Sequence, residues 1–241
     1  MCSVMCYDYH GKWDKKTGHN APLKPRPDEK GNDVFFNLEY TVEYLVKKGA
    51  KPEKTVLGVP LYGRAFLLKN THDDRMGAPA QANSFAGKHF QVFLDILIEL
   101  LFTGPYTREA GFLGYNEICE ELDKEEEGWE VKWEACHKAP YMVNSNKWVS
   151  YDNEKSVKMK ADLAWDKQLA GVMVWSIETD DFHGKIDRLK VYVYCKHILL
   201  SHKLTKAATL IGQESFLMVT VYGKVRVFGT LGIMQDCNLF C

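Results

Sequence analysis

The first quarter of the chain alternates short apolar runs with one stretch of helical periodicity. Ser3 to Tyr9 is a short apolar run that ends in polar groups, as a buried strand does. Apolar residues then recur at helical spacing from Leu38 to Val46, with Asn37 placed to cap the start and Gly49 to end the helix. A second apolar run spans Thr55 to Leu61. This order predicts a β–α–β unit in a parallel sheet with a right-handed crossover.

A second helix and strand are predicted later in the chain. Residues 157–168 carry apolar side chains on one helical face, with Ser156 as the candidate cap, and Gly171 to Ile177 is an apolar run that closes on acidic residues. Strand ends that bear aromatic and polar groups suit the C-terminal mouth of a (β/α) barrel, where such enzymes keep their chemistry. Residues 65–149 are too many for a plain crossover, so they predict a subdomain of their own.

Composition narrows the class of protein. Hydrophobic residues make up 46% and charged residues 26% of the 241, which is typical of a globular chain. A formal net charge of -1 indicates no basic field for nucleic acid or for anionic lipid. The apolar-rich run Phe90 to Phe102 is interrupted by Asp95 and Glu99 and is too short to span a bilayer. The residues after Met1 do not have the pattern of a signal peptide.

The residues that carry metal and cofactor chemistry show no diagnostic pattern. The cysteines and histidines have no common metal-ligand spacing, and the sequence has no phosphate-binding loop, dinucleotide fingerprint or nucleophile elbow. The sequence therefore predicts no metal and no cofactor. Cys2 and Cys6 lie four residues apart on the first predicted strand and are interpreted as buried free thiols. The aromatic share of 12% suits carbohydrate binding, but a large core accounts for it as well.

Four motifs, in chain order, carry a resemblance to a known family. They are Met5 to Asp14 (Met-Cys-Tyr-Asp-Tyr-His-Gly-Lys-Trp-Asp), Thr17 to Leu23 (Thr-Gly-His-Asn-Ala-Pro-Leu), Gly58 to Arg64 (Gly-Val-Pro-Leu-Tyr-Gly-Arg) and Gly171 to Ile177 (Gly-Val-Met-Val-Trp-Ser-Ile). Together they resemble the last three strand ends of the barrel of family 18 glycoside hydrolases, the chitinase family. The second motif looks most like arthropod chitinases. The catalytic signature of the family, Asp-x-x-Asp-x-Asp-x-Glu, does not occur in the sequence.

The resemblance implies an α/β fold, a partial (β/α)8 TIM barrel that comprises the last three strands, with an α+β insertion subdomain. Residues 1–64 would hold barrel strands six and seven with the intervening helix, 65–149 the insertion subdomain, and 150–185 the last helix and strand eight. Residues 83–102 are an atypical insert, and 186–241 are a tail of unknown structure. Two explanations of these departures stay open, lineage-specific insertion and translated intron sequence.

The resemblance also implies catalytic roles near the first strand. In family 18 the acetamido oxygen of the substrate attacks the anomeric carbon, and the protein supplies a glutamic acid, an aspartate and a tyrosine around it. Tyr7 would hold the acetamido oxygen with a neutral phenol, and Asp8 would contact the sugar near the cleavage point. Met5 would share the barrel-interior face of Tyr7 and pack under the sugar. Trp13 would stack on the leaving-group side.

Four further residues would line the groove by the same resemblance. Tyr62 and Arg64 follow the second strand, and a guanidinium binds a carboxylate or sugar hydroxyls in fixed geometry. Glu109 would lie near Arg64, and Trp175 would floor the cleavage subsite with its indole face. Taken singly, these residues are also explained by an ordinary strand end, a tryptophan that holds its loop down (Trp13), a buried strand tryptophan (Trp175) or a surface salt bridge (Arg64 with Glu109). The combination of motifs favours the functional interpretation.

The resemblance leaves more than one function open. The chain is either a chitinase-type hydrolase fragment for β-1,4-linked N-acetylglucosamine polymers or a non-catalytic, chitinase-like lectin. The fragment would be inactive alone because its general acid is not in this sequence. A non-functional product of a truncated transcript is a third interpretation, which the insert and the tail favour. The resemblance further implies chitin or chito-oligosaccharides as the partner and an extracellular location.

Overall fold

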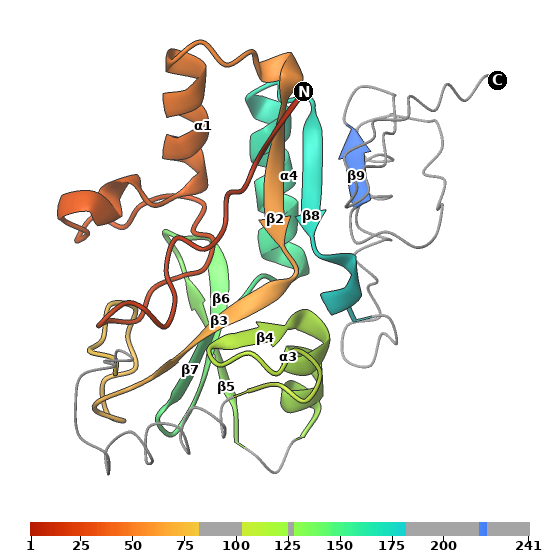
Figure 1. The fold of residues 1–241 in the computed structure, drawn as a ribbon. Coiled ribbons are helices and arrows are strands. Elements are labelled where there is room, and N and C mark those ends of the chain that lie inside the picture. The colour runs from red at the N-terminus through yellow and green to blue at the C-terminus, as the bar shows by residue number, and fades with distance from the viewer. Residues whose placement is uncertain (82–102, 125–127, 182–216, 221–241) are drawn as a thin grey trace.

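The computed structural model describes residues 1–81, 103–124, 128–181 and 217–220, which form two β-sheets with helices beside them (Figure 1). One sheet has four strands in the order β1-β2-β8-β9, and the other has five in the order β4-β3-β7-β6-β5. The atypical insert at 83–102 and most of the tail lie outside the described residues. Among those residues, no helix is long and apolar enough to cross a membrane.

The four-stranded sheet is parallel where the sequence predicted parallel strands. β1 (Cys2–Val4) pairs with β2 (Thr55–Pro60), and β2 pairs with β8 (Gly171–Trp175), each in parallel register. β9 (Leu217–Thr220), from the predicted tail, pairs antiparallel with β8. This sheet is the partial barrel that the sequence predicted.

The first strand is shorter than predicted. The apolar run reaches Tyr9, but pairing ends at Val4, where the amide of Cys6 turns back to donate to the Val4 carbonyl at 3.0 Å. The two thiols expected to share a buried face therefore separate: Cys2 is exposed and Cys6 is buried. The last strand also ends earlier than predicted, at Trp175, and a short 3₁₀ helix (Ile177–Thr179) follows it.

The first predicted helix is confirmed as α1 (Leu38–Lys47), which lies between 3₁₀ turns at Gly31–Phe35 and Pro52–Lys54. The side chain of Asn37 accepts a hydrogen bond from the amide of Tyr40 at 2.9 Å, which satisfies one of the open amides of the first turn. Gly49 follows with φ of 99°, a left-handed conformation that favours glycine and ends the helix.

The second predicted helix is α4 (Glu154–Asp166), and its cap differs from the prediction. Asn153 is the N-cap, whereas Ser156 is the third helical residue. The two side chains each bond the other's backbone amide, so they form a reciprocal capping box. The helix then buries Val157 and Ala161 against the parallel sheet, as the apolar spacing predicted.

The five-stranded sheet is antiparallel and belongs to the α+β part of the fold. Its strands are β3 (Tyr62–Leu67), β4 (Phe112–Gly114), β5 (Glu130–Glu134), β6 (Ala139–Asn144) and β7 (Lys147–Ser150), and α3 (Tyr115–Asp123) follows β4. β3 begins two residues after β2 ends, so the chain passes directly from the parallel sheet into this one (Figure 1). At this corner a Cβ on Gly63 would lie 2.6 Å from the Ser150 carbonyl oxygen, so only glycine permits the close approach of β3 and β7.

Each sheet has its own hydrophobic core. The parallel sheet packs on both long helices through a cluster that includes Leu38, Leu57 and Ala164. The antiparallel sheet packs on α3 through a separate cluster that includes Ile118 and Val149. The corner between β2 and β3 thus joins two cores.

Candidate functional site

The chain takes an unusual turn directly after β1. Asp8 has φ of 61°, in the left-handed region that non-glycine residues rarely adopt. Its amide donates to the Asn20 side-chain oxygen at 2.9 Å. This turn directs the Asp8 carboxylate toward β3, at the C-terminal ends of the parallel strands.

Three donors converge on one carboxylate oxygen of Asp8. The Tyr62 hydroxyl donates to Oδ1 at 2.6 Å, the Arg64 Nε donates to it at 2.8 Å, and the Arg64 Nη2 lies 2.7 Å from it. Charge-assisted bonds of this length are among the stronger ones in proteins. Since 41% of the Asp8 side chain remains exposed, the anchored carboxylate is still open to a ligand.

The Arg64 guanidinium is held among aromatic rings. Its Cζ lies 5.1 Å from the Trp13 ring centroid, 5.3 Å from that of Tyr62 and 5.0 Å from that of Phe112, within cation–π range. Its Nη1 lies 3.6 Å from Oε1 of Glu109. These contacts leave the arginine 7% exposed and fix its orientation before any ligand arrives.

Phe112 is a member of this site that the sequence did not single out. Its ring stacks on Tyr62 with centroids 4.4 Å apart and planes 19° apart. It also lies opposite Arg64 in the register of β3 and β4. The pairing of these strands was not readable from the sequence, so nothing there connected the phenylalanine with the arginine.

The two tyrosines of the site stay protonated over the physiological range. Burial, and then the charge of neighbouring Asp8, raises the pKa of Tyr7 to about 12. Burial and the hydrogen bond to Asp8 raise the pKa of Tyr62 further. The rings meet edge to face, with centroids 6.0 Å apart. Both phenols are therefore neutral hydrogen-bond donors at the mouth of the sheet.

The remaining predicted residues lie at the margins of the cluster. Trp13 is 51% exposed and covers Gly11, where a Cβ would lie 2.4 Å from the ring. Trp175 is half-buried at the end of β8, opposite Pro60 of β2 in the sheet register. Met5 is 70% exposed. Because β1 ends at residue 4, the strand alternation expected to place Met5 on the face of Tyr7 is not formed.

The structure thus brings together most of the predicted site. Hydrogen bonds, ion pairs and ring contacts join six of the eight predicted residues: Tyr7, Asp8, Trp13, Tyr62, Arg64 and Glu109. Met5 follows β1 and Trp175 ends β8, two strands that flank β2 in the sheet, and Trp175 packs against the hydrophobic cluster that contains Tyr7 and Tyr62. Among the described residues, no group of three or more histidine, cysteine, aspartate or glutamate side chains is arranged to hold a metal ion.

A buried histidine fastens the loop after β1 to the antiparallel sheet. His19 is fully buried, and its Nε2 lies 3.2 Å from the Pro140 carbonyl oxygen and 3.0 Å from that of Tyr151. Its Nδ1 accepts a hydrogen bond from the amide of Ala21 at 2.9 Å, so Nε2 carries the proton. Burial holds the pKa of His19 well below its usual range, so the ring is neutral.

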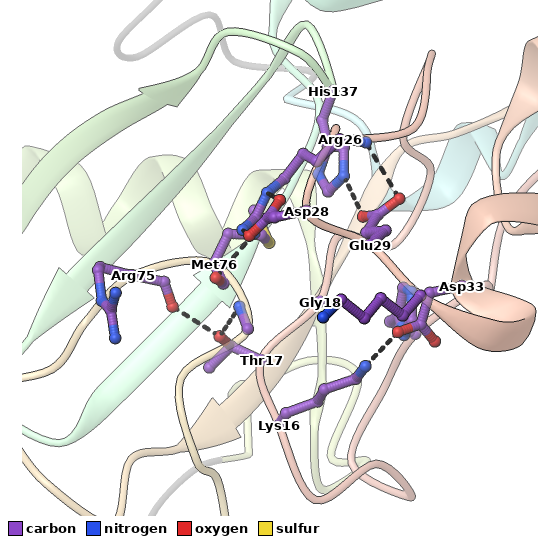
Figure 2. Close-up of a pocket in the computed structure, with 13 residues that line it drawn as sticks. Lys16, Thr17, Gly18, Arg26, Asp28, Glu29, Asp33, Arg75, Met76 and His137 are labelled. Atoms are coloured by element: carbon purple, nitrogen blue, oxygen red, sulfur yellow. Dashed lines mark hydrogen bonds and ion pairs between the residues drawn. The ribbon is translucent and has the colours of Figure 1, made fainter.

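A separate polar pocket of about 350 Å³ lies beside this loop (Figure 2). None of the eight predicted site residues lines it. Its charges are largely satisfied within the wall: Lys16 pairs with Asp33, and Glu29 with His137. The hydroxyl of Thr17 donates to the Arg75 carbonyl across the pocket. The Glu29–His137 and Thr17–Arg75 contacts join the loop to segments of the α+β part, so we assign them a structural role.

Comparison with known proteins agrees with the class of fold described above, part of a (β/α) barrel joined to an α+β subdomain. The pattern of the family Glycosyl hydrolases family 18 matches residues 1–180. The chain belongs to glycoside hydrolase family 18, as the motifs predicted.

Individual relatives include chitinases and a pseudo-chitinase. Probable chitinase 10 of Drosophila melanogaster is 40% identical over 184 residues, which are 76% of this chain and 7% of that protein. The group IV chitinase of Ostrinia furnacalis superposes with a TM-score of 0.64 at 40% identity, over 76% of this chain and 45% of that one. Human YKL-39, a pseudo-chitinase with retained chitooligosaccharide binding, superposes with a TM-score of 0.64 at 36% identity and the same coverage. The chain thus spans less than half the length of each.

Proposed function

We propose that this chain forms one side of a groove that binds chito-oligosaccharides. The observation that carries the proposal is the convergence of Tyr62 and Arg64 on one oxygen of Asp8, beside the exposed ring of Trp13. An indole face is a flat apolar surface for the C–H groups of a sugar ring. The carboxylate and the guanidinium supply fixed polar partners for hydroxyl or acetamido groups.

The rigidity of the arginine supports this proposal. A side chain with several rotatable bonds normally loses conformational entropy when a ligand fixes it. Arg64 is already held by Asp8, by Glu109 and by aromatic rings on several sides. Sugar binding would therefore order few groups, and more of the contact energy would remain as affinity.

In substrate-assisted hydrolysis the roles of these residues would divide as follows. Tyr7, neutral because its pKa is raised to about 12, would donate to the acetamido oxygen and hold it in line with the anomeric carbon. Asp8 would contact the sugar near the scissile bond, and Trp175 would form the floor of the cleavage subsite. Met5 would pack beside the sugar from its exposed position after β1.

We propose that the chain as it stands binds sugar without hydrolysing it. The 241 residues do not contain the acidic signature that supplies the general acid of the family. General acid–base catalysis typically contributes on the order of 10²–10⁴ in rate, and the leaving oxygen would depart unprotonated without it. Retained binding by the pseudo-chitinase YKL-39 supports a lectin-like role as the alternative to a hydrolase fragment.

Calorimetric titration with tetra-N-acetylchitotetraose tests the binding proposal. We expect saturable binding by the chain, weaker binding by Trp13→Ala, and no change in Trp133→Ala, which alters a tryptophan of β5 outside the site. Cellotetraose, which has the same linkage and lacks acetamido groups, is the matched control ligand and is expected not to bind. Equal heats for the two sugars, or no saturation with the first, would refute the proposal.

A fluorogenic chitobiose conjugate tests the absence of hydrolysis. We expect no release of fluorophore above the rate in buffer. Release that rises in proportion to the concentration of pure chain would show that a proton donor exists among these residues, and the proposed inactivity would be wrong. The binding proposal would survive that result, because it depends on the groove residues alone.

The division of the chain and its location complete the proposal. We propose a barrel part at 1–64 and 150–185 with an insertion subdomain at 65–149, and the two separate hydrophobic cores support this division. An extracellular location is proposed from the family resemblance. Accumulation of a tagged native protein inside cells, with none in the medium, would contradict it.

A further inference from the structure

We propose that Asn20 is the positioning residue of this site, because it holds Asp8 in the conformation that presents the carboxylate. The effect of Asn20 on sugar binding rests on the proposed function. Its structural part, the control of the Asp8 backbone, can be measured without any sugar.

Every polar group of Asn20 is engaged although the residue is fully buried. Its side-chain Oδ1 accepts from the amide of Asp8 at 2.9 Å, and its Nδ2 donates to the Tyr62 carbonyl at 3.2 Å. Its own amide donates to the Ser150 hydroxyl at 3.0 Å, and its carbonyl accepts from the amide of Tyr9 at 3.1 Å. One side chain thus connects the turn after β1 with β3.

The bond to Asp8 matters because of the backbone conformation at that residue. With φ of 61°, Asp8 lies in a region that is unfavourable for a residue with a Cβ and persists only where its surroundings hold it. The Asn20 side chain holds both residues of the contact between Asp8 and Tyr62, because it accepts from the backbone N–H of Asp8 and donates to the backbone carbonyl of Tyr62. If it is removed, Asp8 can return to negative φ, and its carboxylate then leaves the Arg64 guanidinium.

The chain offers a closely matched control for this substitution. Asn37 is also fully buried, its Oδ1 also accepts one backbone amide at 2.9 Å, and its Nδ2 also donates to one carbonyl, at 3.0 Å. It caps α1 and makes none of these bonds with Asp8. Asn37→Ala therefore removes the same chemical groups from an equally buried place, and any difference between the two variants reports on Asp8.

Titration of the full chain with tetra-N-acetylchitotetraose tests the functional part. We expect both Asn20→Ala and Asn37→Ala to lower the unfolding midpoint, and only Asn20→Ala to weaken binding, by about tenfold or more. Asp8→Asn, which removes the charge but suits a left-handed backbone, is also expected to weaken binding. Asn20→Ala added to Asp8→Asn should change affinity by less than about twofold, since the residue acts through the carboxylate. Equal losses in the two asparagine variants, or multiplication of the losses in the double variant, would overturn the inference.

Amide hydrogen exchange of Asp8, followed by NMR, tests the structural part without ligand. We expect exchange at Asp8 to be at least about tenfold faster in Asn20→Ala and unchanged in Asn37→Ala. Asn20→Asp keeps the volume and the acceptor for the Asp8 amide and loses only the donor to the Tyr62 carbonyl, so this amide should stay slow even if the alanine variant fails to fold. An unchanged exchange rate in folded Asn20→Ala, or a fast one in folded Asn20→Asp, overturns the inference. A wild-type chain that binds no sugar, but shows the expected exchange pattern, refutes the proposed function alone.

Discussion

Replacement of Glu117 by glutamine should release the loop that carries Glu109. Glu117 is 1% exposed on α3, and its Oε1 accepts from the amides of Tyr106 and Thr107 at 2.7 and 2.8 Å. Its Oε2 accepts from the Thr107 hydroxyl and from the amide of Gly114, both at 2.7 Å. All four bonds go to a buried side chain that has almost the size of glutamine, so the substitution changes chemistry with little change in volume.

The cost follows from the number of donors that lose an acceptor. A glutamine NH₂ in place of Oε1 would face two backbone amides, so the favoured orientation puts the NH₂ in place of Oε2. There the Thr107 hydroxyl can reverse its role and accept, while it donates to the Phe112 carbonyl 3.2 Å away. The amide of Gly114 cannot reverse. The amide of Gly114 and the NH₂ proton that faces it are both left without an acceptor, and together with the loss of charge from the remaining bonds this should cost about 2–4 kcal/mol.

The site offers no room for an alternative placement of the new side chain. A Cβ on Gly104 would lie 2.1 Å from the Glu117 carboxyl carbon, so the loop backbone closes directly over this group. We therefore expect the loss to appear as opening of residues 104–112, which include Glu109, the partner of Arg64. Sugar affinity should fall with it, although the substituted residue does not itself lie in the site.

Urea unfolding at neutral pH measures the free energy, and amide exchange at Tyr106, Thr107 and Gly114 locates the change. Glu120→Gln is the control, because it makes the same substitution on the same helix at a more exposed carboxylate, and we expect a change within about 0.5 kcal/mol. A loss below about 1 kcal/mol in Glu117→Gln, with all three amides still protected, would refute the reasoning from unsatisfied donors.

Three further predictions concern stability. Lys160 Nζ lies 2.5 Å from the Asp152 carboxylate, and neither side chain is more than 1% exposed. Lys160→Met leaves this carboxylate buried without its cation and should lower the free energy of unfolding in urea by about 3–5 kcal/mol; an unchanged free energy would contradict this. The pKa of Tyr7 is raised to about 12 and that of Tyr62 is also raised. The stability that these neutral phenols contribute is therefore fully present below about pH 10 and should fall as the pH approaches 12. The fall should be less steep in Tyr7→Phe, and parallel curves of stability against pH for the two proteins would contradict this prediction. Because the pKa of His19 is lowered by burial, the stability that its neutral ring contributes is fully present above about pH 6.5 and falls as the pH falls below that value. His19→Gln should flatten this pH dependence, and an unchanged midpoint pH of acid unfolding would refute the role of His19.

The local elements were largely readable from the sequence because each is specified by nearby residues. The apolar spacing of α1, its cap at Asn37 and its end at Gly49 are all confirmed. The cap of α4 was wrong by three residues, because asparagine and serine are both good caps and the two cooperate in one capping box. The first strand was predicted to be longer than it is, because an apolar run indicates where a strand is favoured but not where its pairing with the next strand ends.

The sequence alone determined the family, through four motifs whose order is specific, and it determined which residue types stand at the strand ends. The tertiary structure decided how these residues meet. Arg64 and Asp8 are 56 residues apart, and their contact exists because two parallel strands end side by side and β3 turns back over them. The partners that fix them, Asn20 and Phe112, come from the loop after β1 and from β4, which pairs with β3. Hydrogen bonds and ring contacts depend on distances in space. Those distances are set by strands that pair although they lie far apart in the sequence, so the spacing of residues along the chain does not reveal them.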